Sequence, residues 1–271
     1  MKKNLPLVLS VTSGKGGVGK TNFSVNLACE LSSLGYSVVV LDADLGLANV
    51  DIVLGIAPEK NLFHLLHQDA RLDEVLQKTD YGFSILPASS GISEMLALDT
   101  GQKLELLEAL DGLDDNVDFL IVDTGAGIND NVIYFNIAVQ ERILILTPEP
   151  TSLTDAYALI KVLKVEHGIE RFRVVVNMAK SEQEAKKVFA KLHSACDHFM
   201  SGISLDLLGF IPRDDKVRKA VIQQTPFTRL DPSSPASRKM AELAAKVSSL
   251  EAPKVLDGNI KFFWKKLLFQ E

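Results

Sequence analysis

Short apolar runs alternate with helical patterns from one end of the chain to the other. Several runs are apolar at every position, among them 38–41 (VVVL), 119–122 (FLIV) and 143–146 (ILIL). Such strands are buried on both faces, as in parallel sheets that carry helices on either side. The runs predict strands over 7–12, 37–41, 83–87, 119–123, 142–147, 173–177 and 207–211. The patterns between them predict helices over 22–34, 102–110, 152–165, 182–193, 216–224 and 236–250.

This alternation is typical of an α/β protein with a doubly wound, mainly parallel sheet. Ligands of such sheets bind at the carboxyl ends of the strands, so functional residues are expected at that edge. The length of 271 residues suits one large domain. We expect this domain to span residues 1–250. A linker over 251–258, with Pro253 and Gly258, and a separate amphipathic helix over 259–271 are expected to follow.

The composition is that of a globular protein, with 46% hydrophobic and 24% charged residues. The net charge of −6 disfavours direct nucleic-acid binding, which requires clustered basic residues. Cys29 lies in a helical stretch and Cys196 in a stretch that we interpret as a loop, which does not suit a disulfide framework. A cytoplasmic location is therefore expected. The N-terminal apolar run resembles a short signal peptide, but it leads directly into a glycine-rich loop, so we interpret it as a buried strand.

Residues 13–21 read SGKGGVGKT and lie between a predicted strand and a predicted helix. They match the phosphate-binding pattern G-x-x-x-x-G-K-[ST], whose glycines let backbone N–H groups turn towards phosphate oxygens. Lys20 is expected to neutralise the β- and γ-phosphates, and Thr21 to offer its hydroxyl to Mg²⁺. The nucleotide-binding residues expected from this loop are Gly14, Gly16, Gly17, Val18, Gly19, Lys20, Thr21 and Asn22.

Lys15 is a second lysine, at a position that the pattern leaves open. A long cation there is either a solvated surface residue or a group that points outward along the rim of the loop. The stretch KGGVGKT resembles the deviant Walker A motif of the MinD/ParA class of ATPases. The resemblance implies that ATP brings two copies of the chain together. It also implies that Lys15 then reaches the partner's nucleotide and acts on the charge of phosphoryl transfer, as an arginine finger does.

Aspartates end two of the predicted strands: Asp42 and Asp44 follow one, and Asp123 ends another. A buried carboxylate is costly unless it meets a metal or a hydrogen-bond donor, and a helix N-cap is the simpler alternative for any one of them. The resemblance implies that Asp44 orients the attacking water, that Asp123 holds Mg²⁺ through a water, and that Asp42 supports the metal shell. Gly125 and Gly127 leave the following loop free to respond to a γ-phosphate. The residues expected to take part in hydrolysis are Lys15, Lys20 and Asp44.

The base is expected to be adenine. Guanine-binding proteins carry Asn-Lys-x-Asp after a strand, whereas the strand here ends in Asn177-Met178-Ala179-Lys180. In relatives, the asparagine after this strand and the backbone at IPRD frame the adenine, which implies roles for Asn177, Pro212 and Arg213. Asn177 could equally be a loop-capping residue.

Five later stretches resemble the flagellar number regulators, the FlhG/FleN/YlxH branch of the MinD family. They are DADLGLANVDIVLG (42–55), DTGAG (123–127), TPEPTSLTDAYALIK (147–161), VNMAKSEQEA (176–185) and GFIPRDDKVRKAV (209–221). The resemblance covers residues 7 to about 225 and continues into the C-terminal helix. DTGAG departs from the Asp-Thr-Pro-Pro-Gly common among cell-division relatives, which favours the flagellar branch.

The resemblance implies two partners, the signal-recognition-type GTPase FlhF and a flagellar transcription activator. Many members activate the GTPase through an N-terminal Asp-Gln-Ala motif. Six residues precede the first predicted strand here and lack it, so this activity is not expected. Three other functions stay open: a MinD-type selector of the division site, a metal-cluster scaffold or carrier ATPase, and a DNA-segregating ParA protein. The scaffold reading lacks its usual paired cysteines, and the ParA reading lacks a basic surface.

The last thirteen residues, NIKFFWKKLLFQE, carry one apolar stripe if they form a helix. Lysines flank the stripe, as in helices that lie in a membrane interface, whereas Phe262 and Phe269 fall on the other side. The alternative is a terminal helix packed on its own domain. We expect both states, with ATP-driven dimerisation freeing two copies for the inner face of the cell membrane. The stripe consists of Ile260, Phe263, Trp264, Leu267 and Leu268.

Overall fold

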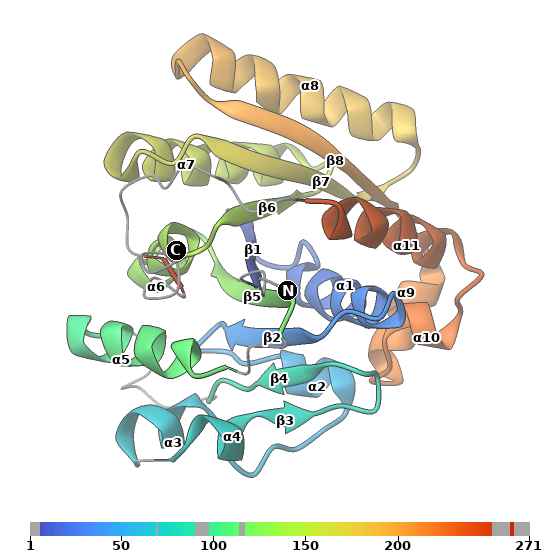
Figure 1. Ribbon diagram of the computed structural model, residues 1–271. Helices are drawn as coiled ribbons and strands as arrows, with labels where there is room; N and C mark the ends of the chain where they lie inside the picture. The colour runs from blue at the N-terminus through green and yellow to red at the C-terminus, as the bar shows by residue number, and fades with distance from the viewer. Residues whose placement is uncertain (1–5, 69, 90–97, 114–116, 251–260, 263–271) are drawn as a thin grey trace.

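The computed structural model of the chain describes residues 6–68, 70–89, 98–113, 117–250 and 261–262. Strands and helices alternate along it, as expected (Figure 1). The strands are β1 Leu7–Ser13, β2 Val38–Ala43, β3 Gln77–Lys78, β4 Ser84–Leu86, β5 Phe119–Ala126, β6 Glu141–Leu146, β7 Arg171–Ala179 and β8 Ser204–Pro212. The helices are α1 Lys20–Ser33, α2 Val50–Leu54, α3 Leu62–His67, α4 Leu72–Val75, α5 Thr100–Asp111, α6 Asp130–Ala138, α7 Pro150–His167, α8 Glu182–Phe199, α9 Asp215–Ile222, α10 Phe227–Leu230 and α11 Pro235–Ser248.

The strands form one eight-stranded sheet in the order β3-β4-β2-β5-β1-β6-β7-β8. Every pairing is parallel except that of β3 with β4. The doubly wound, mainly parallel sheet is therefore confirmed, and β1 lies in its middle between β5 and β6. β3 was not predicted, because its two residues are polar and exposed and carry no apolar pattern.

Helices cover both faces of the sheet (Figure 1). One face packs against α1, α2, α9, α10 and α11, and the other against α3 to α8. Successive residues of β1 serve the two faces in turn: Leu9 and Val11 join the first core, whereas Val8 joins the second. This alternation of two apolar faces is the pattern from which the parallel sheet was predicted.

Several helices differ from the sequence prediction: α2, α3, α4, α6 and α10 were not predicted, and α8 is longer than expected. The helix predicted over 182–193 continues to Phe199, so Cys196 lies on a helix and is buried, not in a loop. No glycine or proline interrupts the sequence before Phe199, and so nothing ends the helix earlier. α6 was not predicted because its residues are apolar on nearly all sides, which hides the helical period. Its readable signal is Asn129, whose side chain accepts a hydrogen bond from the Val132 amide.

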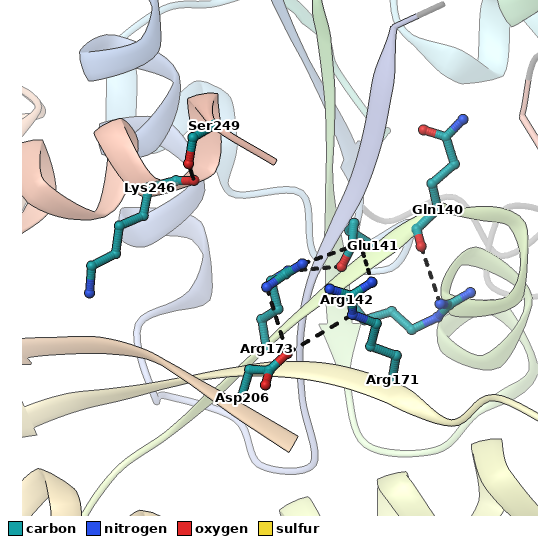
Figure 2. A network of polar contacts seen from close by, with 8 residues as sticks. All are labelled: Gln140, Glu141, Arg142, Arg171, Arg173, Asp206, Lys246 and Ser249. Atoms are coloured by element: carbon teal, nitrogen blue, oxygen red, sulfur yellow. Dashed lines mark hydrogen bonds and ion pairs between the residues drawn. The ribbon is translucent and has the colours of Figure 1, made fainter. Parts of the chain in front are cut away.

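An ion-pair network around the buried Glu141 carboxylate ties the amino ends of β6, β7 and β8 together (Figure 2). The Glu141 carboxylate is 1% exposed and accepts a hydrogen bond from Arg173 Nε at 2.9 Å. Arg171 Nη1 lies 3.6 Å from Glu141, and Arg173 Nη1 lies 3.7 Å from the Asp206 carboxylate. The network lies at the opposite end of the strands from the glycine-rich loop and is structural.

Two residues of the terminal segment are described, and both contact α6. Phe262 is fully buried against Phe135, with ring centroids 6.4 Å apart, and its amide donates to Ala138 O at 2.9 Å. Lys261 Nζ donates to Ile137 O at 2.6 Å. The stripe residues lie outside the described residues, as do the linker and the predicted helix boundaries. No described helix combines the length and the apolar character needed to cross a membrane.

Candidate functional site

The glycine-rich loop joins β1 to α1 at the carboxyl edge of the sheet, in the expected strand–loop–helix context. Gly17 and Gly19 have φ of 76° and 93°, a left-handed conformation that favours glycine. Gly14 is needed for a different reason, because a Cβ there would lie 2.0 Å from Asp155 O on α7. Gly19 is the N-cap of α1 and provides no side-chain cap, so the first-turn amides of α1 face the loop. This backbone fits a bound phosphate group.

Lys20 lies at the start of α1 with its side chain buried in the loop. Its Nζ donates to Ser13 Oγ at 3.0 Å. Burial lowers the pKa of this ammonium, while the nearby carboxylates of Asp123 and Asp44 act in the opposite direction. Lys20, Asp44 and Asp123 therefore lie close enough to interact, as one site requires.

Asp123 on β5 is buried, and its Oδ1 accepts a hydrogen bond from Ser24 Oγ at 2.8 Å. Burial raises the pKa of Asp123 to about 6, whereas hydrogen bonds from Ser24 and Thr21 favour the charged form. A threonine hydroxyl beside a carboxylate is a donor set that suits Mg²⁺, which binds through few protein oxygens and keeps several waters. The residues present therefore fit a magnesium ion held by Thr21 and Asp123 next to a nucleotide.

Asp42 lies opposite Asp123 on the neighbouring strand β2 and is equally buried. Its carboxylate accepts backbone amide hydrogen bonds from Asp44, Asn49 and Val50, at 3.1, 3.0 and 3.1 Å. Burial, followed by the Asp123 charge, raises the pKa of Asp42 well above its usual range. These bonds show what Asp42 does in this structure: it fixes the loop from Asp44 to α2. Support of a metal shell stays a prediction.

Asp44 is half-buried where that loop meets the loop after β5. A Cβ added to Gly125 would lie 3.4 Å from Asp44 Oδ1, so the two loops are in close contact. A cavity of about 360 Å³ lies between them. It is lined by residues 43–47, Gly125, Asn129, Asn131 and Val132. This position is consistent with the predicted role of Asp44 beside a γ-phosphate.

Lys15 does not extend freely into solvent. Its Nζ contacts Glu149 Oε2 at 2.5 Å and Thr151 Oγ1 at 2.8 Å, both at the start of α7. The side chains of Lys15 and Glu149 are 33% and 64% exposed. A single subunit thus binds its own second lysine at the rim of the loop, through an exposed pair that costs little to break.

Asn177 contacts the glycine-rich loop directly. Its Nδ2 donates to Val18 O at 2.7 Å, and a Cβ on Gly19 would lie 2.5 Å from that nitrogen. Met178 follows with φ of 58°, and its amide donates to Asn177 Oδ1. Asn177 is therefore a loop-anchoring residue in this structure, and its predicted contact with adenine remains a prediction.

Pro212 and Arg213 lie next to the end of β7. Pro212 pairs with Ala179, whose carbonyl accepts a hydrogen bond from the Arg213 amide at 2.9 Å. The structure thus brings the IPRD segment to the same edge of the sheet as Asn177.

Sequence reasoning missed four residues that hold the site together: Ser13, Ser24, Glu149 and Thr151. Ser13 and Ser24 are the hydrogen-bond partners of Lys20 and Asp123, and Ser24 could have been found one helical turn after Lys20. Glu149 and Thr151 had no signal, because nothing local connects them with a loop more than 130 residues earlier.

The fold and this site together define a P-loop nucleotide-binding protein, with Mg²⁺ held beside the phosphates. The chain belongs to the CobQ/CobB/MinD/ParA nucleotide-binding domain family, whose model matches residues 9–227. Proteins of this MinD/ParA type are ATPases that bind ATP with Mg²⁺, and this chain is one of them.

Among the relatives that match nearly the whole chain are two flagellar proteins. The antiactivator FleN of Pseudomonas aeruginosa is 47% identical over 96% of this chain and 93% of its own length. The flagellum site-determining protein YlxH of Helicobacter pylori is 32% identical over 96% of this chain and 89% of its own. Among solved structures, the septum site-determining protein MinD of Pyrococcus horikoshii, complexed with Mg-ADP, superposes with a TM-score of 0.75. It is 28% identical and covers 90% of this chain and 97% of that one.

We predict that Asn177→Ala weakens ADP and GDP binding by a similar factor of roughly five, the value of one lost hydrogen bond. The physical reason is that the Asn177 amide holds the Val18 carbonyl of the phosphate-binding loop, a contact that does not depend on the base. Asn177→Asp should weaken both more, because a carboxylate would face the carbonyl oxygen. Titration calorimetry with the two nucleotides measures this, and a loss confined to ADP would instead assign Asn177 to the adenine.

Proposed function

We propose that this chain is an ATP-dependent switch that regulates the number and placement of flagella. The observation that carries the proposal is the 47% identity to FleN along almost the whole chain, together with the site that surrounds Lys20. YlxH, named for flagellar site determination, supports the same role. We propose two partners for it, an FlhF-like GTPase and a flagellar transcription activator, because its motifs resemble those of the flagellar number regulators.

Hydrolysis in this proposal follows from the placement of the charged groups. Lys20 would compensate the phosphate charge. Thr21, and Asp123 through a water, would hold Mg²⁺, which would stabilise the charge of the transferred group. Asp44 lies at the mouth of the same site, where it orients the attacking water. All of these residues come from one subunit, so each subunit carries this part of the site by itself.

Lys15 completes the site in our proposal when two subunits meet face to face. In one subunit it is held by Glu149 and Thr151, so it must leave them to reach a partner's nucleotide. An exposed ion pair of this kind contributes up to about 1 kcal/mol, a small barrier to that exchange. ATP hydrolysis is then slow in isolated subunits and faster in the dimer.

We predict that Lys15→Ala keeps ATP affinity within about twofold and lowers turnover about a hundredfold or more, as loss of a trans-acting cation does. Light scattering with ATP and Mg²⁺ and a phosphate-release assay measure dimerisation and turnover. Asp44→Ala is the matched comparison. Asp44→Ala should form a stable dimer with ATP, because hydrolysis no longer returns the protein to its monomer. An Asp44→Ala protein that stays monomeric with ATP would overturn the switch.

The terminal segment connects the switch to a membrane in our proposal. Phe262 and Lys261 dock on the carboxyl end of α6, so these two residues rest on their own domain. Phe262 lies on the opposite side of the expected helix from the stripe. We propose that the helix moves as a unit. It then either docks Phe262 on α6 or places the stripe in the membrane, but does not do both at once.

We predict that Phe262→Ala increases co-sedimentation with anionic phospholipid vesicles in the presence of ADP, because it removes the buried anchor. Wild type should bind them mainly with ATP, since two tethered helices bind more tightly than one. A chain ending at Gly258 is the control and should not bind in either state. Equal binding of all three proteins would contradict the docking proposal.

The flagellar role is tested in cells. We predict that the chain, expressed in P. aeruginosa lacking FleN, returns the number of flagella per cell towards that of the parent strain, and that Lys15→Ala does not. Flagella are counted by electron microscopy. A chain that leaves flagellation unchanged but shifts the position of division septa would instead favour the MinD-type function.

A further inference from the structure

The central strand β1 buries two hydroxyl groups on the face that packs against α6. Ser10 and Thr12 are fully buried, whereas Leu9 and Val11 make the opposite face apolar. A buried hydroxyl is costly unless it is hydrogen-bonded, so these two residues need polar partners inside the core.

Asn136 of α6 supplies both partners. Ser10 Oγ donates to Asn136 Oδ1 at 2.9 Å, and Asn136 Nδ2 donates to Thr12 Oγ1 at 3.0 Å. The same Nδ2 donates to Val132 O at 2.8 Å, and the Asn136 side chain is fully buried. Both ends of the amide are therefore used, and its orientation is set by donors and acceptors on β1.

The contact continues one turn later. The Gln140 amide donates to Val8 O, and Gln140 Oε1 accepts from the Val8 amide, both at 3.0 Å. The buried Arg142 guanidinium donates to Asn136 O at 2.7 Å and to Val139 O at 2.9 Å, which closes the carboxyl end of α6. Figure 2 shows the Gln140 carbonyl directed at Arg142, with its side-chain amide pointing away.

The two elements joined in this way carry the two halves of the site. β1 ends at Ser13, which leads into the loop of Lys20. We call residues 44–49, between β2 and α2, the first switch loop, and residues 127–129, between β5 and α6, the second switch loop. The loop is anchored to β1 as well, since the Gly127 amide donates to Ser13 O at 3.0 Å. Any sliding of α6 along β1 would shift this loop relative to Lys20.

We propose that Asn136 is a positioning residue for ATP hydrolysis: it fixes the register of α6 on β1 and thereby places the second switch loop against Lys20. Apolar packing is non-directional and allows several neighbouring registers of a helix on a strand. An amide that donates to one hydroxyl and accepts from another is satisfied in a single register. Asn136 touches no phosphate-binding residue of the site, so it acts through α6. The proposal rests on the ATP hydrolysis of the proposed function and is independent of the flagellar partners.

The test replaces the whole network by apolar groups. Asn136→Leu alone would leave two buried hydroxyls unpaired and destabilise the fold. The triple variant Ser10→Ala, Thr12→Val and Asn136→Leu removes donors and acceptors together, which can leave stability nearly unchanged. We expect its kcat for ATP to fall about tenfold to a hundredfold, the effect of a misplacement near 1 Å, with KM and ADP affinity within about twofold.

A matched variant removes two other buried hydroxyls, Ser234→Ala with Ser237→Ala on α11, far from the switch loops. It should keep the wild-type kcat even though it loses Ser234, the N-cap of α11, and is therefore less stable to heat. Wild-type turnover, measured in the same assay, separates a failure of this proposal from a failure of ATP hydrolysis itself. A triple variant that turns over like wild type, or that loses ADP affinity together with kcat, overturns the positioning role.

Hydrogen exchange on the wild-type protein gives a second measurement that needs no variant. On adding a non-hydrolysable ATP analogue, amides 125–129 should become more protected than with ADP, while those of 131–138 should exchange equally slowly with either nucleotide. Faster exchange of the α6 amides with the analogue would mean that α6 moves on β1, which would overturn the proposal.

Discussion

Two buried carboxylates lie side by side on neighbouring strands, Asp42 on β2 and Asp123 on β5, and the placement of the site depends on how their charge is compensated. Neither could be buried without partners. Asp42 takes three backbone amides of the loop that follows it, and Asp123 takes the hydroxyl of Ser24. The nearby Lys20 ammonium also favours the charged form of Asp123. Compensation of the two aspartates therefore ties the first switch loop and helix α1 to the same edge of the sheet.

Strand β1 carries the phosphate-binding loop, and its neighbours hold it in place. β1 is paired on both sides, by β5 and β6, and its loop passes so close to α7 that only glycine fits at position 14. On the α6 side its two hydroxyls are bonded to Asn136. The phosphate-binding loop thus follows a strand that is held on both of its edges and on both of its faces.

Most of this structure could be predicted from local sequence patterns. All strands except β3, the phosphate-binding loop and the aspartates could be predicted, because apolar runs, glycine spacing and strand-end charges are patterns of neighbouring residues. Contacts between distant segments could not: Glu149 meets Lys15 across 134 positions, and Asn136 meets Ser10 across 126. α6 itself escaped prediction because a helix buried on nearly every side has no polar face to reveal its period. The element that links the two halves of the site was thus the hardest to read.

The contacts of this protein fall into two strengths, and the difference suits a switch. Those of Asp42 and Asn136 are buried, so breaking one leaves an unpaired polar group at a cost of about 1–3 kcal/mol. The contact of Lys15 with Glu149 is exposed at both ends and contributes up to about 1 kcal/mol. A bound nucleotide can therefore redirect Lys15 while the frame around Lys20 stays intact. The weak contact of Lys15 lies at the rim of the site, and the strong contacts of Asp42 and Asn136 lie beneath it. A second subunit that approaches the rim would therefore meet Lys15, the residue whose contacts are easiest to exchange.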